Sequence, residues 1–297
     1  MADVTTPPGF GLLLPSPLAE LRDDRLTGRD VTLWLKRDDL INPEIPGNKW
    51  RKLKYNLEAA RDQGHRTLLT FGGAYSNHIG ATAAAGHRFG FSTIGVIRGE
   101  EHLPLNPVLD RAVSRGMRLT YLDRGTYRRK SDDEVVARLR HEWGDFYLIP
   151  EGGSNEPAVR GCAELPQEMD TGFDVICCPC GTGGTLAGIA AGLEPGRRAL
   201  GFSVLRGGEF LDGTVRDLQQ RAFGHVRANW SIEHGFHFGG YARKPPELEA
   251  FVSDFHRRHG IALERIYVAK MMYGIFALAE RGAFERGTRI VAVVTGP

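Results

Sequence analysis

The sequence predicts an α/β fold in which a mainly parallel sheet carries helices on both faces. Apolar segments typical of buried strands alternate along the chain with segments typical of helices. Two glycine-rich junctions, at residues 72–73 and 181–184, each directly follow a predicted strand. The 297 residues, 41% hydrophobic and 25% charged, have an ordinary globular composition and suffice for one large domain or two medium ones.

The first half of the chain gives the clearest alternation. A buried strand is predicted over residues 66–73, and a helix rich in small residues follows over 76–90 and stops at a glycine. A later helix begins at Asn106 as its N-cap, has Pro107 at its first position and ends at Gly116. Further strands are predicted over 92–99, 117–123 and 145–150, and a further helix over 131–144.

The second half continues the pattern. A strand is predicted over 173–180, a helix from 183 to 192 and a strand over 199–207. A last strand over 289–297 reaches the end of the given sequence. The proline-rich segment 5–17 is expected to form an extended N-terminal arm.

Charge and hydropathy exclude several function classes. The formal net charge is +2, and basic and acidic residues interleave, so nucleic acid is not an expected partner. No apolar run approaches the length of a membrane span, and the start of the sequence lacks the form of a signal peptide. These observations predict a cytoplasmic enzyme that does not act on a membrane.

Cysteine and histidine spacing does not predict a metal site. Three of the four cysteines lie in the predicted strand 173–180, and no second ligand pair follows at a suitable spacing. We therefore expect buried strand residues that pack as small apolar side chains at Cys162, Cys177, Cys178 and Cys180. His234 and His237 have the spacing of a ligand pair but lack a third ligand.

The second glycine-rich junction is the sharper candidate site. Its glycines let backbone N–H groups converge, its threonines add hydroxyls, and the following helix presents its positive N-terminus, which together suit a phosphate. The residues concerned are Gly181, Thr182, Gly183, Gly184 and Thr185. A tight turn without a ligand is the alternative. Leu186 stands where a dinucleotide fingerprint has its third glycine, and no Gly-Lys-Ser/Thr ending closes a Walker A loop.

The first junction offers a second polar cup. Ser76, Asn77 and His78 begin a predicted helix directly after a strand, where free N–H groups, a hydroxyl and an amide suit a carboxylate. Ser and Asn are also the usual N-cap residues, and this stretch alone favours a cap.

Lys49 follows a Pro-Gly-Asn turn at 46–48, which fixes its place and lets other backbone come close. Arg51 and Lys52 are interpreted as cations on a helix surface or a domain contact, and Trp50 as a packing residue. Asp38 and Asp39 are expected to pin the turn through hydrogen bonds. A placed lysine, a phosphate cup and a carboxylate cup are the parts that hold pyridoxal phosphate (PLP) and an amino acid.

The chain resembles the family of 1-aminocyclopropane-1-carboxylate (ACC) deaminases and D-cysteine desulfhydrases from about Leu14 to its last residue. The motifs that carry the resemblance occur in the family's order: KRDDL…GNKWRKL, FGGAYSNHIGATAAAG, IPEGGSN, GTGGTLAGI, HFGGYAR and IYVAKMMYGI. The resemblance implies the tryptophan-synthase-β-like fold of fold-type-II PLP enzymes, with two open, twisted, mainly parallel sheets. It also implies a homodimer. We expect a larger PLP-binding domain from residues 1–51 and 151–297, and a smaller α/β domain from 52–150.

The resemblance implies roles residue by residue. Lys49 matches the lysine that forms the Schiff base, Thr295 falls near the pyridine nitrogen, and the loop 181–185 matches the phosphate cup. Asn77 matches the asparagine that bonds the ring oxygen of the cofactor, and Ser76 matches the serine of the substrate-carboxylate cup, close to the reacting carbons, with His78 next in the same loop. Tyr241 and Tyr267 match two tyrosines that face the substrate.

Departures from the family pattern bear on the choice between the two reactions that the family catalyses. ACC deaminases carry a glutamate where this chain has Val268, and the family's His-Thr-Gly-Gly ending here reads Val294-Thr295-Gly296-Pro297. We expect β-elimination from a small amino acid, as in D-cysteine desulfhydrases, with ACC deamination as the alternative. A PLP-binding protein with altered or lost catalysis is a further alternative. A nucleotide-binding oxidoreductase is another function class, and only the glycine-rich loop supports it.

Overall fold

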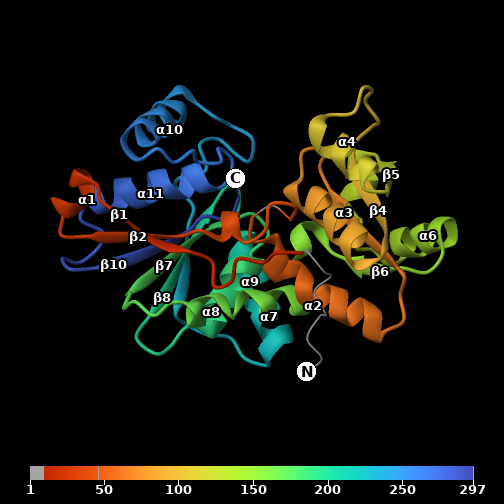
Figure 1. Ribbon diagram of the computed structural model, residues 1–297, viewed down its shortest axis with the longest axis horizontal. Helices are drawn as coiled ribbons and strands as arrows, with labels where there is room; N and C mark the ends of the chain where they lie inside the picture. The colour runs from red at the N-terminus through yellow and green to blue at the C-terminus, as the bar shows by residue number, and fades with distance from the viewer. Residues whose placement is uncertain (1–9, 46, 297) are drawn as a thin grey trace.

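The computed structural model describes residues 10–45 and 47–296 of the chain. Residues 5–9 of the predicted arm, Pro46 of the predicted turn and the final Pro297 lie outside the described residues. The strands form two sheets, each with its own helices, that lie on opposite sides of the molecule (Figure 1). The predicted α/β fold with two mainly parallel sheets is confirmed.

One sheet has six strands in the order β1-β2-β10-β7-β8-β9. β1 pairs with β2 antiparallel, and the other neighbours are parallel. The strands are β1 (Leu18–Leu21), β2 (Thr32–Lys36), β7 (Val175–Cys180), β8 (Arg198–Ser203), β9 (Trp230–Glu233) and β10 (Arg289–Val293). Both ends of the described chain therefore contribute to one sheet.

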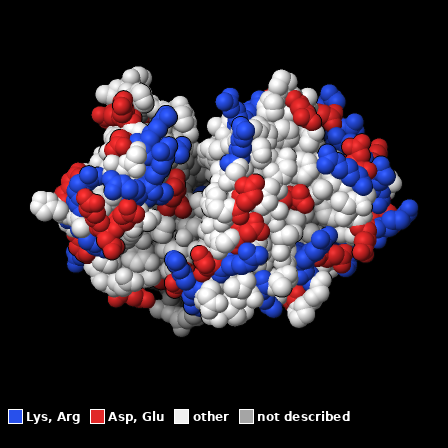
Figure 2. Space-filling model, turned by 180° about the vertical axis from the view of Figure 1, so that it is seen from behind, with Lys and Arg blue, Asp and Glu red and all other residues white. Residues whose placement is uncertain are grey.

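The second sheet has four parallel strands in the order β5-β4-β3-β6. They are β3 (Thr67–Gly72), β4 (Ser92–Arg98), β5 (Met117–Leu122) and β6 (Tyr147–Ile149). A cleft separates the two halves of the molecule in the space-filling view of the rear face (Figure 2).

Helices cover both faces of each sheet. They are α1 (Asp24–Thr27), α2 (Lys49–Asp62), α3 (Asn77–Phe89), α4 (Pro107–Ser114), α5 (Arg124–Arg128), α6 (Asp133–Trp143), α7 (Glu156–Cys162), α8 (Gly184–Gly192), α9 (Phe210–Phe223), α10 (Pro246–His259) and α11 (Val268–Glu280). Short 3₁₀ turns are η1 (Asp38–Leu40), η2 (Glu151–Gly153) and η3 (Leu165–Glu168). Among the described residues, no helix combines the length and the apolar character that a membrane span requires.

The six-stranded sheet is the centre of the larger core. Side chains of β7 alternate between its faces, as the two-residue period of a strand requires: Cys177 packs with α10 and α11, and Cys178 packs with α8 and α9. All four cysteines are buried and free, as predicted, although Cys162 lies in α7 and not in a strand. Trp50 is buried and stacks on Phe89, which confirms its interpretation as a packing residue.

Glycines let three helices stack closely. A Cβ on Gly161 of α7 would lie 1.9 Å from the carbonyl oxygen of Arg51 in α2, so only glycine allows this approach. A Cβ on Gly188 of α8 would lie 2.4 Å from the carbonyl oxygen of Val159 in α7. The stack α2–α7–α8 brings the first residues of α2 next to the first residues of α8.

Most of the predicted elements are present, and some limits differ. α4 begins at Pro107 with Asn106 as N-cap, as predicted. The last strand ends at Val293 because the next carbonyls leave the sheet: Val294 accepts from Asp39 N–H, and Thr295 accepts from Asn48 N–H. The predicted domain limits stay a prediction, and the limit between residues 51 and 52 falls inside α2.

Candidate active site

The predicted turn before Lys49 packs against the end of the chain. Gly47 has φ of +68°, and a Cβ there would lie 1.9 Å from the carbonyl oxygen of Thr295. The N–H of Asn48 donates to the same carbonyl at 3.1 Å. Glycine is therefore required at position 47 for its backbone angle and for its close approach to Thr295.

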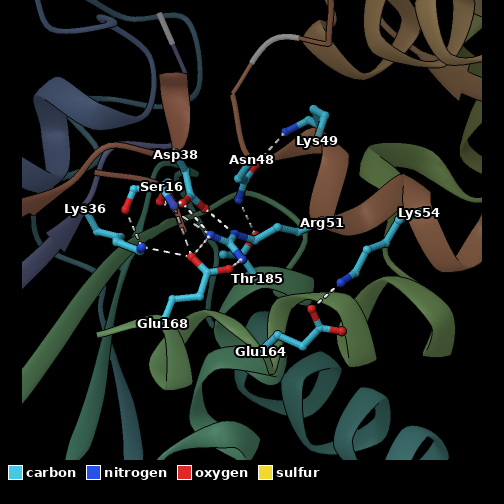
Figure 3. A network of polar contacts seen from close by, with 10 residues as sticks. All are labelled: Ser16, Lys36, Asp38, Asn48, Lys49, Arg51, Lys54, Glu164, Glu168 and Thr185. Carbon is cyan, nitrogen blue, oxygen red and sulfur yellow. Dashed lines mark hydrogen bonds and ion pairs between the residues drawn. The ribbon is translucent and has the colours of Figure 1, made fainter. Parts of the chain in front are cut away.

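Lys49 is the first residue of α2, and its side chain is half-buried. Its ammonium donates to Asn48 Oδ1 at 3.3 Å, and Asn48 Nδ2 donates in turn to Thr185 Oγ1 at 3.2 Å (Figure 3). Burial, together with the positive charge of Lys52, lowers the pKa of Lys49 to about 7. A large fraction of the amine is thus neutral at physiological pH, as a nucleophile requires.

The glycine-rich loop from Gly181 to Thr185 runs from the end of β7 into the first two residues of α8. Gly183 is the N-cap of α8, has φ of +74° and offers no side chain to the first N–H groups of the helix. Ser154 closes one side of the loop: its hydroxyl lies 2.5 Å from that of Thr182, and a Cβ on Gly184 would lie 2.6 Å from Ser154 Oγ. The loop is therefore a glycine-lined cup at a helix N-terminus, which suits an anion.

Lys52 adds a positive charge close to this cup. Its side chain is buried, so of its two predicted places, a helix surface or a domain contact, the helix surface is wrong, and its ammonium donates to Gly152 O at 3.0 Å. Gly152 itself touches the cup, because a Cβ there would lie 2.9 Å from Thr182 Oγ1. Burial lowers the pKa of Lys52, so a bound anion nearby would favour its charged form.

Arg51 is likewise buried, so it too is not on a helix surface, which was the first of its two predicted places. Its guanidinium binds Asp38 Oδ2 at 2.7 Å and Glu168 Oε1 at 2.6 Å (Figure 3). Lys36 binds the other oxygen of Glu168 at 2.9 Å. Asp38 therefore fixes the first turn of α2 through Arg51, whereas Asp39 pairs with Arg37. We call Lys36, Asp38, Arg51 and Glu168 the buried ion network.

The predicted carboxylate cup lies at the start of α3. Ser76 occupies the N-cap position, but within the described chain its hydroxyl makes no capping hydrogen bond, so it does not act as the cap that the sequence favours. Asn77 reaches the end of the chain, since its Nδ2 would lie 3.7 Å from a Cβ on Gly296. Within the described chain, the Ser76 hydroxyl is thus not committed to the helix start.

His78 is buried behind this cup. Thr70 donates its hydroxyl to Ile149 O, so it accepts from His78 Nε2 at 2.9 Å, and His78 carries its proton on Nε2. Its Nδ1 has no hydrogen-bond partner among the described residues. Burial, and then the charges of Lys49 and Lys52, lower the pKa of His78 well below its ordinary value, so the ring is neutral.

Tyr267 and Tyr241 form a pair against the glycine-rich loop. The Tyr267 hydroxyl donates to the Tyr241 hydroxyl at 3.2 Å, and the rings meet edge to face with centroids 5.5 Å apart. A Cβ on Gly181 would lie 3.0 Å from Tyr267 Cε1. Burial raises the pKa of both phenols, so they remain protonated.

Glu264 caps α11 just before Tyr267. Its carboxylate accepts from the N–H groups of Ile266 at 2.7 Å and Tyr267 at 2.6 Å. Val268, the first residue of the helix, is fully buried. The carboxylate at this helix start is thus committed to backbone amides.

Other sequence candidates lie apart from these contacts. His234 Nε2 pairs with Asp212 at 3.0 Å, and His237 Nδ1 accepts from Gly239 N–H at 2.9 Å. No group of three or more metal-ligating side chains occurs in the part of the chain that the structure describes.

Residues from distant segments therefore come together: hydrogen bonds link Lys49 through Asn48 to Thr185, Tyr267 lies against the backbone of Gly181, and Asn77 lies near the backbone of Gly296. Sequence reasoning did not place Asn48, Lys52 or Ser154 in the candidate site. Each lies in a motif that carries the family resemblance, which was the signal available. A partly neutral lysine amine suits an aldehyde, and an uncapped helix start suits a phosphate, so these residues fit PLP.

Comparisons with known proteins agree with this fit. The profile of the family described as pyridoxal-phosphate dependent enzyme matches residues 11–296. The chain is 32% identical over 282 residues to a Pyrococcus horikoshii protein provisionally named 1-aminocyclopropane-1-carboxylate deaminase, which covers 92% of this chain and 86% of the relative. It is 28% identical over 306 residues to the D-cysteine desulfhydrase of Klebsiella pneumoniae, which covers 95% and 91%.

Two further matches point the same way. The chain is 29% identical over 289 residues to a mitochondrial bifunctional D-cysteine desulfhydrase/1-aminocyclopropane-1-carboxylate deaminase of Arabidopsis thaliana, which covers 89% of this chain and 72% of the relative. A crystal structure of an ACC deaminase homologue superposes with a TM-score of 0.83 at 29% identity and covers 100% of this chain and 95% of that one. The chain belongs to the family of pyridoxal-phosphate-dependent enzymes.

Proposed function

We propose that this PLP enzyme eliminates the β-substituent of a small D-amino acid, with D-cysteine as the preferred substrate, and yields pyruvate, ammonia and sulfide. One observation carries the choice of reaction. At the start of α11, the position that bears glutamate in ACC deaminases holds buried Val268, and the nearby carboxylate of Glu264 is engaged by backbone N–H groups. Thr295 offers the ring nitrogen a hydroxyl, which cannot supply a negative charge.

The roles of the residues follow from their chemistry. Bound PLP supplies an electron sink for the bonds at the substrate's α-carbon. Lys49 holds the cofactor and, with its pKa of about 7, can take up a proton at neutral pH. The loop 181–185 and Lys52 hold the phosphate, and Thr295 lies toward the ring nitrogen.

The remaining predicted residues act on the substrate. Ser76, Asn77 and the backbone N–H of His78 at the start of α3 receive its carboxylate, because the only ring N–H of His78 is already bound to Thr70, and Asn77 also bonds the ring oxygen of the cofactor. Tyr241 and Tyr267 face the amino acid as neutral phenols. Their hydroxyls donate or accept hydrogen bonds without adding charge.

The proposed reaction balances in atoms and electrons. The α-proton of D-cysteine passes to Lys49 or Ser76, and the carbon–sulfur bond breaks so that sulfur leaves with the bonding pair as hydrosulfide. The released enamine takes up water and gives pyruvate and ammonia. Because water is consumed, the net change also has the character of a hydrolysis.

ACC deamination is the second candidate, because several relatives carry that name. ACC has no α-hydrogen, so its cyclopropane ring must open by another route. That route benefits from a charged partner at the pyridine nitrogen of the cofactor. Without that charge the barrier should be higher by several kcal/mol, and about 1.4 kcal/mol corresponds to tenfold in rate.

A substrate panel tests the proposal. The holoenzyme is incubated with D-cysteine, L-cysteine, D-serine and ACC, and sulfide, pyruvate and 2-oxobutanoate are measured, with Lys49→Ala as the inactive control. We expect sulfide and pyruvate from D-cysteine and little 2-oxobutanoate from ACC. Efficient 2-oxobutanoate release without sulfide would establish the ACC reaction instead. Inactivity on all four would favour a different amino acid or a PLP-binding protein with lost catalysis.

We further propose that the enzyme works as a homodimer in the cytoplasm on a free amino acid, without nucleic acid or membrane partners. The family resemblance supports the dimer. Positive and negative side chains interleave over the face in Figure 2, which does not favour a polyanionic partner. Sedimentation velocity of the purified holoenzyme tests the dimer, and a monomer at micromolar concentration would contradict it.

A further inference from the structure

Lys270 lies in the first turn of α11, three residues after Tyr267. Its side chain is fully buried, yet it is not part of the cofactor or substrate contacts described above. Its ammonium donates to three backbone carbonyls, those of His237 at 3.0 Å, Gly240 at 2.7 Å and Tyr241 at 2.9 Å. An ammonium has three N–H donors, so each one meets a carbonyl.

The loop that these carbonyls belong to has an unusual backbone. Three consecutive residues have positive φ: Phe238 at 54°, Gly239 at 85° and Gly240 at 128°. For a bulky residue such as Phe238, the left-handed region is sterically strained. The loop therefore needs contacts from outside to hold this shape.

α11 supplies those contacts. Besides the three hydrogen bonds from Lys270, the ring of Phe238 packs edge to face on Tyr273 of α11, with centroids 4.9 Å apart. Because Tyr267 directly precedes the same helix, one rigid element holds both partners of the tyrosine pair. The 3.2 Å contact between the hydroxyls of Tyr241 and Tyr267 thus depends on the hydrogen bonds and the ring contact between α11 and this loop.

We propose that Lys270 is a positioning residue, whose ammonium clamps the loop 237–241 so that the Tyr241 hydroxyl stays beside Tyr267 on the substrate side of the site. This inference rests on the proposed function, in which the two tyrosines face the amino acid. The alternative is that Lys270 only stabilises the fold, with no bearing on Tyr241.

Kinetics of Lys270→Gln test the first consequence. The variant keeps N–H donors but loses the charge and the third hydrogen bond. We expect PLP binding and its visible absorption to persist while kcat/KM falls roughly a hundredfold, as a displacement of about 1 Å at a reacting group can cause. Lys244→Gln, an exposed lysine just beyond the same loop, is the matched control and should leave both unchanged.

A double-mutant cycle separates positioning from simple stabilisation. If Lys270 acts through the Tyr241 hydroxyl, Lys270→Gln should cost little more in a Tyr241→Phe background, because the group it positions is already gone. Losses in kcat/KM that simply multiply in the double variant would overturn the proposal, and so would loss of PLP binding in Lys270→Gln alone.

Hydrogen exchange gives a readout that needs no turnover. Backbone amides of residues 237–241 should exchange faster in the Lys270→Gln holoenzyme than in the Lys244→Gln holoenzyme, and equal rates would overturn the clamp. Failure of the proposed function would instead appear as inactivity of the unaltered enzyme on the substrate panel, with the exchange difference intact.

A second variant covers the case in which Lys270→Gln does not fold. Gly240→Ala strains the loop at φ of 128° without changing α11, and its Cβ would meet no atom closer than 3.7 Å. It should retain PLP and lower kcat/KM in the same way. If kcat/KM is unchanged in Gly240→Ala, the shape of the loop does not affect turnover, and the proposal is wrong.

Discussion

Helices α2 and α11 both begin at the candidate site, and each carries a buried or half-buried lysine in its first turn. Burial lowers the pKa of Lys49 to about 7 and that of Lys270 to about 8. Their hydrogen bonds differ: Lys270 donates to three carbonyls, whereas within the described chain Lys49 donates to Asn48 Oδ1 alone, at 3.3 Å.

This difference shows that burial by itself does not make a lysine reactive. Desolvation destabilises the charged form of both amines, but the three carbonyls around Lys270 compensate its ammonium and occupy every donor. Lys49 lacks such compensation, so its amine remains available for a covalent bond.

Each helix start also separates the reacting residue from the residue that anchors it. In α2, Lys49 faces the site and Arg51, two residues later, joins the buried ion network. In α11, Tyr267, the proposed substrate contact, directly precedes the helix, and Lys270, three residues later, donates to the carbonyls of the neighbouring loop. Residues two apart on a helix point to different faces, and residues three apart lie on one face about one turn apart, so in both helices one side chain can react while the other is fixed.

The largest effect is expected for Lys49→Ala, which removes the available amine at the start of α2. Lys49→Ala should abolish the PLP adduct that borohydride traps, and activity should fall by several orders of magnitude, because no other amine replaces the nucleophile. Peptide mapping of the reduced holoenzyme checks the attachment site. An adduct mapped to Lys270, Lys52 or another lysine would contradict the assignment.

The second effect tests the anchor of α2. Arg51→Met leaves Asp38 and Glu168 without their common partner, and breaking a buried ion pair costs about 3–5 kcal/mol of unfolding free energy. Arg22→Met is the control, since Arg22 pairs with Glu20 on the surface and such a pair contributes about 0–1 kcal/mol. Urea unfolding measures both variants. Equal losses would mean that the buried ion network does not fix α2.

The smallest effect concerns the pKa of Lys49 and the pH dependence of its reaction with PLP. Only the neutral amine of Lys49 attacks the aldehyde, so the rate of PLP capture by the apoprotein should rise through pH about 7 and level off above it. Lys52→Met removes a positive charge that lowers this pKa, so the midpoint should move to higher pH. Stopped-flow absorbance follows the capture, and a midpoint near the ordinary lysine value of 10.5 would refute the shift.

Local sequence signals were enough for most of the four-stranded sheet and its helices. The strands β3 and β4 are continuous apolar runs, and α3 and α4 carry a terminal glycine or an Asn-Pro start, so neighbouring residues specify them. The short strands β1 and β9 escaped prediction, because four partly exposed residues show no clear period until they pair with β2 and β8.

The sequence by itself determined the fold class, the cofactor and the glycines of the two glycine-rich junctions, because these depend on local patterns and on motifs in a fixed order. Only the tertiary structure decided which polar residues work together. The basic run predicts a helix surface or a domain contact for Arg51 and Lys52 but names no partner, whereas in the structure Asp38 and Glu168 give Arg51 its counter-charges, and Glu168 lies 117 residues away in sequence. Asn48 meets Thr185 across 137 residues. A charge is buried only where folding supplies its partner, and the residues near it in sequence do not reveal that partner.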